Sequence, residues 1–347
     1  MKKHTIKDIA QLAGVSKGTV DRVIHKRGKV SEKALEKVNK VLAEIDYQPN
    51  LMARSLKNNK DYHLCALLPN PDIDPYWLPC KAGINQAFNE YKSLGITIDT
   101  HTFDPTSTED FLEVNARVLS LNPDAVLMVP LFFNEATKSI KAYAEAEILV
   151  SIINNRIGSE DINNFVGQDL FQSGRIAARL MEMITPKDSE IIIAHLDEFF
   201  HNASFMQQKE KGFRDYFENL LTSNYTLKTC NSIESNKYKT LFDAIDSSKN
   251  ISGIFVTTSK TYKVAKMVEN FPNLSIKIIG YDLLEKNISY LNSGAIDFLI
   301  HQNPKQQIYL GLSQLAEYFL FDKPISEEKL LSIDIINSEN YNSYLNQ

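Results

Sequence analysis

The stretch from Thr5 to Ile24 constrains the chain most, because it predicts two short helices joined by a tight turn. Thr5 is a favourable N-cap, and Asp8 stands where a capping box needs its acidic partner. Gly14 ends the first helix and Ser16 begins the second. The first helix carries one apolar stripe, made of Ile6, Ile9, Ala10 and Ala13.

The second helix presents two faces of different chemistry. At about 100° per residue, the packing face carries Thr19, Val20, Val23 and Ile24. The other face offers two cations, a bare backbone position and an imidazole, which suits base edges in a DNA major groove. A solvated face of an ordinary helical hairpin is the alternative. The candidate DNA-contacting residues of this motif are Thr5, Ser16, Lys17, Gly18, Thr19, Asp21, Arg22 and His25.

A third helix should begin at Ser31 and cover the first two with Ala34, Val38, Val41, Leu42 and Ile45. Three blocks of this part of the chain, DIAQLAGVSKGTVDRVI, KVS and YQPNLMARSL, occur in an order and spacing that resemble the LacI/GalR family of bacterial transcription regulators. The resemblance implies a helix-turn-helix DNA-binding domain over residues 1–48. Many family members have serine where Asp21 stands, which we interpret as tuning the choice of operator.

Residues 49–61 form the expected hinge helix and linker. Asn50 can cap a helix here, but a helix this short is marginal alone, because isolated helices under about 12 residues are unstable in water. The resemblance implies that it forms against its copy in a second subunit and in the minor groove, with Ala53 at the helix contact and Leu56 as the wedge between bases. For Leu56 the alternative is an anchoring contact to the rest of the chain.

The charge is distributed unevenly along the chain. The net charge of −5 combines +8 in residues 1–60, from 14 Lys and Arg against 6 Asp and Glu, with −13 in the remainder. A basic head on an acidic body indicates that the head meets a polyanion and the body does not. The sequence therefore predicts double-stranded DNA as a partner of the head, with an operator of two-fold symmetry.

From residue 62 onward the pattern changes to short apolar runs that alternate with amphipathic stretches, which predicts parallel, doubly wound α/β sheets. The units are too many for one sheet, and the resemblance implies a two-lobed, periplasmic-binding-protein-like body over residues 62–347. The first lobe should comprise 62–166 and 301–347, and the second 167–300. The predicted strands are 63–68, 97–103, 125–129, 149–153, 190–196, 251–256, 276–281 and 297–300.

Ligands of parallel sheets bind outside the carboxyl ends of the strands, where this chain has polar and aromatic loops. The resemblance implies a small carbohydrate-like effector there: a sugar, sugar acid or sugar phosphate. Tyr76 and Trp77 could stack on a sugar ring or belong to the core. Asp282 could instead cap the next helix, and Arg156 could form a surface ion pair. The candidate effector-binding residues are Asp74, Tyr76, Trp77, Asn155, Arg156, Lys209, Thr258, Ser259, Asp282 and Gln302.

Three of these positions depart from the pattern of sugar-binding members. Asn155 replaces an aspartate, Thr258 and Ser259 replace an asparagine–aspartate pair, and Lys209 replaces an arginine. Two cations with fewer anions favour an acidic effector, so the hypothesis is a sugar acid or sugar phosphate rather than a neutral hexose.

No catalytic motif, metal-ligand cluster or cofactor-binding loop is recognisable, so we expect neither an enzyme nor a cofactor or metal. His195 and His201 are interpreted as structural. Three widely spaced cysteines, no signal peptide and no membrane span predict a cytoplasmic, nucleoid-associated protein. Only a short tail follows Ile336, so a homodimer is expected. The alternatives are a cytosolic solute-binding or catalytic α/β protein with an incidental helical head, and a regulator that senses a protein partner.

Overall fold

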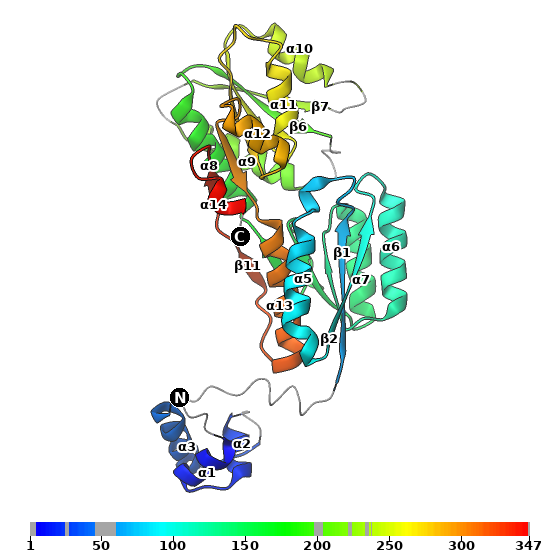
Figure 1. Ribbon diagram of the computed structural model, residues 1–347, viewed down its shortest axis with the longest axis vertical. Helices are drawn as coiled ribbons and strands as arrows, with labels where there is room; N and C mark the ends of the chain where they lie inside the picture. Colours follow the sequence, from blue (N-terminus) through cyan, green and yellow to red (C-terminus); the bar gives the residue numbers. More distant parts are fainter. Residues whose placement is uncertain are drawn as a thin grey trace. The chain divides into compact units, whose positions relative to one another are not determined.

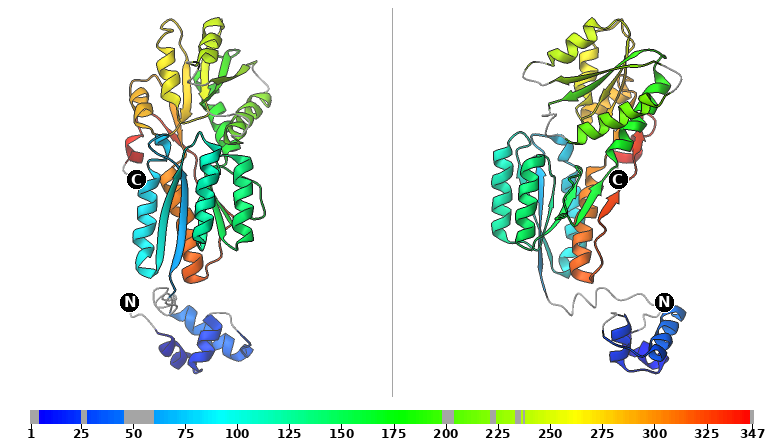
Figure 2. Two further views of the ribbon diagram at one scale, coloured as in Figure 1. Left: turned by 90° about the vertical axis from the view of Figure 1, so that its right-hand side faces the viewer. Right: turned by 180° about the vertical axis from the view of Figure 1, so that it is seen from behind.

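The chain divides into two compact units, Met1–Lys57 and Asn58–Gln347, called here the head and the body. The structure is a computed structural model that describes residues 5–24, 28–45, 60–197, 204–220, 224–232, 236 and 238–345. Figures 1 and 2 show the helical head and the two-lobed α/β body. In the described ranges, no helix is both long and apolar enough to span a bilayer.

The head contains α1 (Ile6–Ala13), α2 (Lys17–Ile24) and α3 (Glu32–Glu44). The predicted capping box is present, because the Thr5 hydroxyl accepts from the Asp8 N–H at 3.3 Å while the Asp8 carboxylate accepts from the Thr5 N–H at 2.8 Å. Gly14 takes the left-handed conformation at φ 61°, which ends α1. The core of the head joins all three helices through Ile9, Ala10, Ala13, Val20, Val23, Val38 and Val41.

The start of α3 differs from its prediction. Ser31 stands at the N-cap, but its side chain makes no capping hydrogen bond; its backbone carbonyl accepts from Ala34 and Leu35 instead. Leu42 and Ile45 pack partly buried against the core of the head, and Ala34 is half-buried. The covering role predicted for α3 therefore falls mainly on Val38 and Val41.

The first lobe is a parallel sheet in the order β11-β5-β4-β3-β1-β2. Its strands are β1 (Tyr62–Pro69), β2 (Ile96–Phe103), β3 (Ala125–Met128), β4 (Leu149–Ile153), β5 (Asn164–Gly167) and β11 (Glu328–Leu330). One face is covered by α5 (Cys80–Tyr91) and α13 (Pro304–Phe321), and the other by α6 (Thr108–Leu121) and α7 (Phe133–Glu145). Short 3-10 helices span Pro75–Trp77 and Lys92–Leu94.

The second lobe is a sheet in the order β12-β10-β9-β8-β6-β7, parallel except where β12 joins β10. Its strands are β6 (Glu190–Leu196), β7 (Thr226–Ser232), β8 (Ile251–Val256), β9 (Lys277–Tyr281), β10 (Phe298–His301) and β12 (Asp334–Ile336). One face is covered by α8 (Leu170–Ile184) and α9 (Ser204–Glu218). The other is covered by α10 (Lys239–Ser247), α11 (Thr261–Val268) and α12 (Glu285–Asn292), and the chain ends in α14 (Asn342–Leu345).

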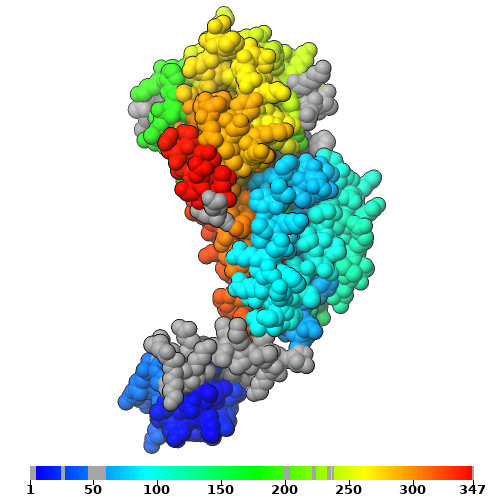
Figure 3. All heavy atoms as spheres, viewed as in Figure 1, coloured from blue at the N-terminus to red at the C-terminus, as the bar shows by residue number. Residues whose placement is uncertain are grey.

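All eight predicted strands occur within a residue or so of their expected bounds, but the end of the chain corrects the predicted lobes. Residues 304–330 do return to the first sheet, as α13 and β11. β12, however, pairs antiparallel with β10 of the second sheet, which buries Ile336 completely. Tyr341 and Tyr344 also pack against the core of the second lobe, and Figure 3 shows this segment, in red, on the surface of that lobe.

Two glycines let α8 and α9 touch backbone to backbone. A Cβ on Gly174 would overlap the Lys209 carbonyl oxygen, and a Cβ on Gly212 would overlap the Phe171 carbonyl oxygen. A backbone carbonyl cannot move aside as a flexible side chain can. The close contact between the two helices therefore fixes where the Lys209 backbone lies relative to α8.

Replacing Gly212 by alanine is expected to destabilise the protein. The new methyl group has to separate α8 from α9, which should lower the free energy of unfolding by about 1–3 kcal/mol, as overpacking generally does. Urea unfolding followed by circular dichroism measures this. Gly158→Ala is the control, because nothing lies within 4 Å of a Cβ there. Equal stability of the two variants would contradict the close helix contact.

Candidate effector site and nucleic-acid interface

The exposed face of α2 carries the residues predicted to contact DNA. Lys17, Gly18 and Arg22 are exposed, and the Arg22 Nε donates to the Gly18 carbonyl oxygen at 3.0 Å. Ser16 caps the helix by accepting from the Thr19 N–H at 3.1 Å. Asp21 is half-buried on the same helix. The other predicted DNA contacts, His25, Asn50, Ala53 and Leu56, lie outside the described residues, as does His201.

Three segments connect the two sheets of the body, at residues 168–169, 302–303 and 331–333. One side chain of the first segment contacts the third segment and the residue that directly precedes the second. The Gln168 amide nitrogen, in the first segment, donates to the carbonyl oxygens of His301 at 2.9 Å and Ser332 at 2.6 Å. Gln168 is buried, so these bonds are shielded from water. Any change in the angle between the lobes has to act through this joint.

On the first-lobe side, the loop after β1 folds back over the sheet. Asp74 caps the 3-10 helix by accepting from the Tyr76 N–H at 3.2 Å. The Tyr76 hydroxyl accepts from the Asn154 side chain at 2.5 Å. Tyr76 and Trp77 are 6% and 4% exposed and belong to the apolar core, which is the alternative that the sequence left open for them. Asn155, next along, is buried, and its side-chain oxygen has no hydrogen-bond partner among the residues that the structure describes.

On the second-lobe side, Asp282 follows β9 with a left-handed backbone at φ 66°. Its two carboxylate oxygens accept from the Gln302 backbone N–H at 2.9 Å and from the Gln302 amide at 2.7 Å. The carboxylate thus fixes the second connecting segment. The alternative of a helix cap is wrong, because Leu284 occupies the N-cap of α12.

Lys209 is the buried cation of the second lobe. Its ammonium donates to the Thr257 carbonyl oxygen at 3.0 Å and stands 3.6 Å from the centre of the Tyr281 ring. Thr258 and Ser259 follow Thr257 directly at the end of β8, as predicted, and the Ser259 carbonyl accepts from Asn287 at 2.8 Å. Sequence patterns missed Thr257 and Tyr281, whose only signal is their place at strand ends.

Arg156 does not share this environment. Its guanidinium forms an ion pair with Glu328 of β11 at 2.5 Å and has a 64% exposed side chain. It also lies over the Phe165 ring, 5.6 Å from the centroid. This is the surface ion pair that the sequence left open as the alternative. Of the two cations expected at the effector site, Arg156 is thus engaged at the surface and Lys209 is buried.

Near the carboxyl ends of the strands, charged groups of one lobe shift the pKa values of groups in the other. Burial raises the pKa of Asp74, the Lys260 ammonium of the second lobe opposes this, and the Asp282 carboxylate adds to it. Burial also raises the pKa of Tyr76, and Asp282 contributes again. Leu284 of the second lobe packs against the first lobe's core. The loops at the carboxyl ends of both sheets therefore form one electrostatic environment.

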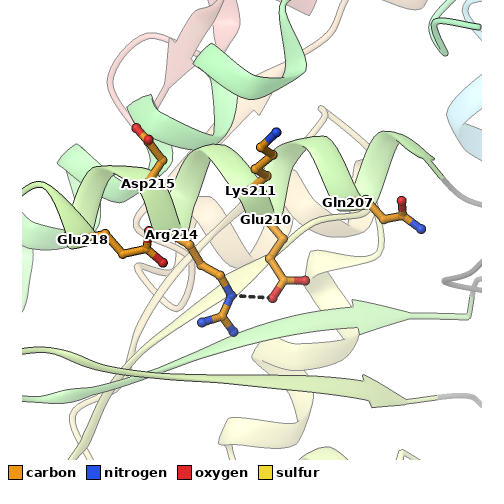
Figure 4. A pocket seen from close by; sticks show the side chains of 6 residues that line it. All are labelled: Gln207, Glu210, Lys211, Arg214, Asp215 and Glu218. Atoms are coloured by element: carbon orange, nitrogen blue, oxygen red, sulfur yellow. Dashed lines mark hydrogen bonds and ion pairs between the residues drawn. The ribbon is translucent and has the colours of Figure 1, made fainter.

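A polar network that the sequence did not predict lies beneath α9. Glu210 accepts from His195 at 2.8 Å, from Arg214 at 2.7 Å and from the Thr229 hydroxyl. Burial alone would raise the pKa of Glu210, but the hydrogen bonds from these three side chains outweigh it and lower the pKa to about 2. Figure 4 shows Glu210 and Arg214 projecting from α9 on the side of the strands.

Two surface pockets are lined by residues other than the predicted effector-binding residues. One of about 330 Å³ is lined by a single helix, α9, through Gln207, Glu210, Lys211, Arg214, Asp215 and Glu218. Another of about 520 Å³ lies between β2 and α6. In the described part of the chain, no three histidine, cysteine or acidic side chains are grouped to hold a metal ion. Cys65, Cys80 and Cys230 are buried free thiols.

Fold and site together define a transcription regulator with a helix-turn-helix head and a periplasmic-binding-protein body. Two family descriptions match the chain: "Bacterial regulatory proteins, lacI family" over residues 5–50 and "Periplasmic binding protein domain" over residues 65–323. The chain belongs to the LacI family of bacterial regulators.

Proteins of known sequence or structure are similar to this chain. The ribose operon repressor of Lactococcus lactis is 25% identical over 332 residues, 94% of each chain. The repressor PurR of Vibrio atlanticus is 56% identical over 55 residues, 16% of each chain. A crystal structure described as a LacI transcriptional regulator from Bacteroides fragilis covers 82% of this chain and all of that one, with TM-score 0.76 and 26% identity. A solute-binding protein from Agrobacterium vitis, bound to α-D-tagatopyranose, shares the fold at TM-score 0.71 and 20% identity, covering 81% of this chain and 96% of its own.

Glu210→Gln is expected to destabilise the body in a pH-dependent way. Because the folded pKa of about 2 lies below the usual 4.5, the carboxylate's contribution is complete above pH 4.5 and is lost as the pH falls toward 2. At pH 7 the variant should lose about 2–3 kcal/mol of unfolding free energy. Urea unfolding at pH 7, 5, 4 and 3 measures the difference.

The control is Glu145→Gln, which removes an exposed partner of Lys141 and should change stability little at any of these pH values. A gap between wild type and Glu210→Gln that stays constant down to pH 3 would contradict the role of the ionised carboxylate.

Proposed function

We propose that this regulator is a homodimeric, cytoplasmic repressor that binds a two-fold-symmetric operator on the nucleoid. A small carbohydrate bearing an anionic group, a sugar acid or sugar phosphate, binds between the carboxyl ends of its two sheets and changes its operator affinity. Differential binding to two lobe arrangements shifts their equilibrium, and the first lobe transmits this to the hinge. The relatives' roles as repressors, one of them of a ribose operon, support this function.

The observation that carries the proposal is the grouping of polar groups at the strand ends. Asn155 contributes a buried amide oxygen that makes no hydrogen bond within the described residues. Asp282 and Gln302 supply a carboxylate and amide at the joint between the lobes. Lys209 supplies a buried positive charge. Hydroxyl groups suit the first three side chains, and an anionic group suits the ammonium.

Lys209→Met tests the anionic part of this proposal. The variant keeps a chain of similar length but loses the charge, so it should bind an acidic or phosphorylated sugar about 10–100-fold more weakly, the usual loss for a hydrogen bond to a charged group. Affinities are measured by calorimetry with matched pairs: D-ribose and D-ribose 5-phosphate, D-glucose and D-gluconate.

Arg156→Met is the matched control, because its guanidinium is engaged with Glu328 at the surface, and it should leave these affinities nearly unchanged. Preference of the wild type for the neutral member of each pair would overturn the anionic effector. Absence of binding to every sugar tested would instead favour a body that senses a protein partner.

Asp21→Ser is expected to change which operator sequences are selected. A carboxylate on the DNA-contacting face repels phosphates unless it accepts from a cytosine amino group or orients Arg22, its neighbour. Selection of bound DNA from a random library, compared for wild type and variant, measures this. Identical selected sequences would remove the proposed role of Asp21.

The alternative is a solute-binding or catalytic α/β protein. It would give the exposed residues of α2 no role. The repressor names of the relatives argue against catalysis, and we assign the chain no catalytic residue. Loss of operator binding in Arg22→Ala with an intact head fold would separate the two functions, since a catalytic or transport role does not depend on that side chain.

A further inference from the structure

Lys209 is the only lysine among the described residues that is fully buried, at 1% exposure. Its ammonium meets the Thr257 carbonyl oxygen at 3.0 Å and the face of Tyr281 at 3.6 Å. Tyr281 is itself held through its hydroxyl, 2.9 Å from that of Ser173 on α8. Since Tyr281 is held in this way, the position of the ammonium also depends on what holds its other contact, Thr257.

His195 holds Thr257 from the end of the neighbouring strand. Its Nδ1 lies 2.6 Å from the Thr257 hydroxyl, and its Nε2 lies 2.8 Å from the Glu210 carboxylate. Glu210 is an acceptor only, because its pKa is lowered to about 2, so Nε2 carries a proton. The ring's Nδ1 shares a hydrogen bond with the Thr257 hydroxyl, which also donates to the Ala194 carbonyl oxygen at 3.3 Å. The buried imidazole thus bridges the end of β8 to α9.

This bridge also fixes the rotation of α9. Glu210 follows Lys209 directly, so the two side chains leave the helix about 100° apart. Glu210 is held on its own side by Arg214 and by Thr229 of β7. The contact with Gly174 sets the distance between α8 and the Lys209 backbone. With helix distance and rotation both set, Lys209 has one position for its ammonium.

We propose that His195 is a positioning residue of the effector site, which sets where Lys209 presents its charge by fixing both the Thr257 carbonyl oxygen and α9. This inference rests on the proposed function of Lys209 as the contact for an anionic effector group. The sequence alone predicts a structural role for His195, and the proposal adds a role in the effector site. His195 does not contact the effector; it acts through Thr257 and Glu210.

Acetylation of lysines in the folded full-length protein, quantified by mass spectrometry, tests the positioning step without any ligand. His195→Leu should raise the rate at Lys209 about tenfold relative to Lys277, because the pocket that shields the ammonium opens locally. His195→Gln, which keeps a polar group within reach of Glu210, should restore part of the protection. Should His195→Leu fail to fold, Thr257→Val decides, since it removes only the hydroxyl and should act in the same direction.

His63→Leu is the matched control. It removes another histidine–carboxylate pair, His63 with Asp99 at 2.9 Å in the first lobe, and should leave the rate at Lys209 unchanged. An unchanged rate at Lys209 in both His195→Leu and Thr257→Val overturns the proposal. An equal rise at every lysine also overturns it, because that indicates general destabilisation.

Affinity separates this inference from the proposed function. In His195→Leu, binding of D-ribose 5-phosphate should weaken about tenfold while binding of D-ribose changes less, and adding Lys209→Met should cause little further loss because both changes disturb one contact. Additive losses would overturn the positioning role. If the wild type binds neither sugar nor any other anionic carbohydrate, the proposed effector fails, while the acetylation rates still decide whether His195 positions Lys209.

Discussion

The Gln168 amide is the constraint on which the two-lobed body depends, because it ties the first connecting segment to the third and to the end of β10, where the second begins. A parallel sheet needs a crossover for every strand, and here three connections run between separate sheets. Asp282 and Gln302 brace the second of them. A joint held by a few buried hydrogen bonds can have discrete arrangements, which is what control by a ligand requires.

The site draws its chemistry from groups that also hold the fold together. Asp74 caps a helix and Asp282 braces a connection, while Lys209 lies against a carbonyl oxygen and an aromatic face. A ligand entering between the lobes would meet groups already oriented, so it would spend little of its binding free energy on ordering them. Residues deeper in the second lobe, such as His195 and Glu210, supply that orientation.

Local pattern predicted much of this molecule. The capping box, the turn at Gly14 and the eight apolar strands follow from neighbouring residues alone. β7 escaped prediction because it is a largely exposed, polar strand at the edge of the sheet. β5 has only Phe165 and Val166 between an asparagine and a glycine, and the three-residue β11 begins with two charged residues, so neither forms an apolar run. The partner of Arg156 is 172 residues away, so sequence spacing could not choose between effector and ion pair. The bridge of His195 to Thr257, 62 residues on, was hidden for the same reason.

The central claim is that effector and operator binding are coupled through the lobes, and reciprocity tests it most directly. An effector that changes operator affinity by some factor must have its own affinity changed by the same factor when operator is bound. Both are measurable by fluorescence anisotropy and calorimetry, using DNA selected by the protein and the anionic sugar that it binds. Equal factors, clearly different from one, are the predicted result. An operator affinity that does not change at saturating sugar would contradict the account.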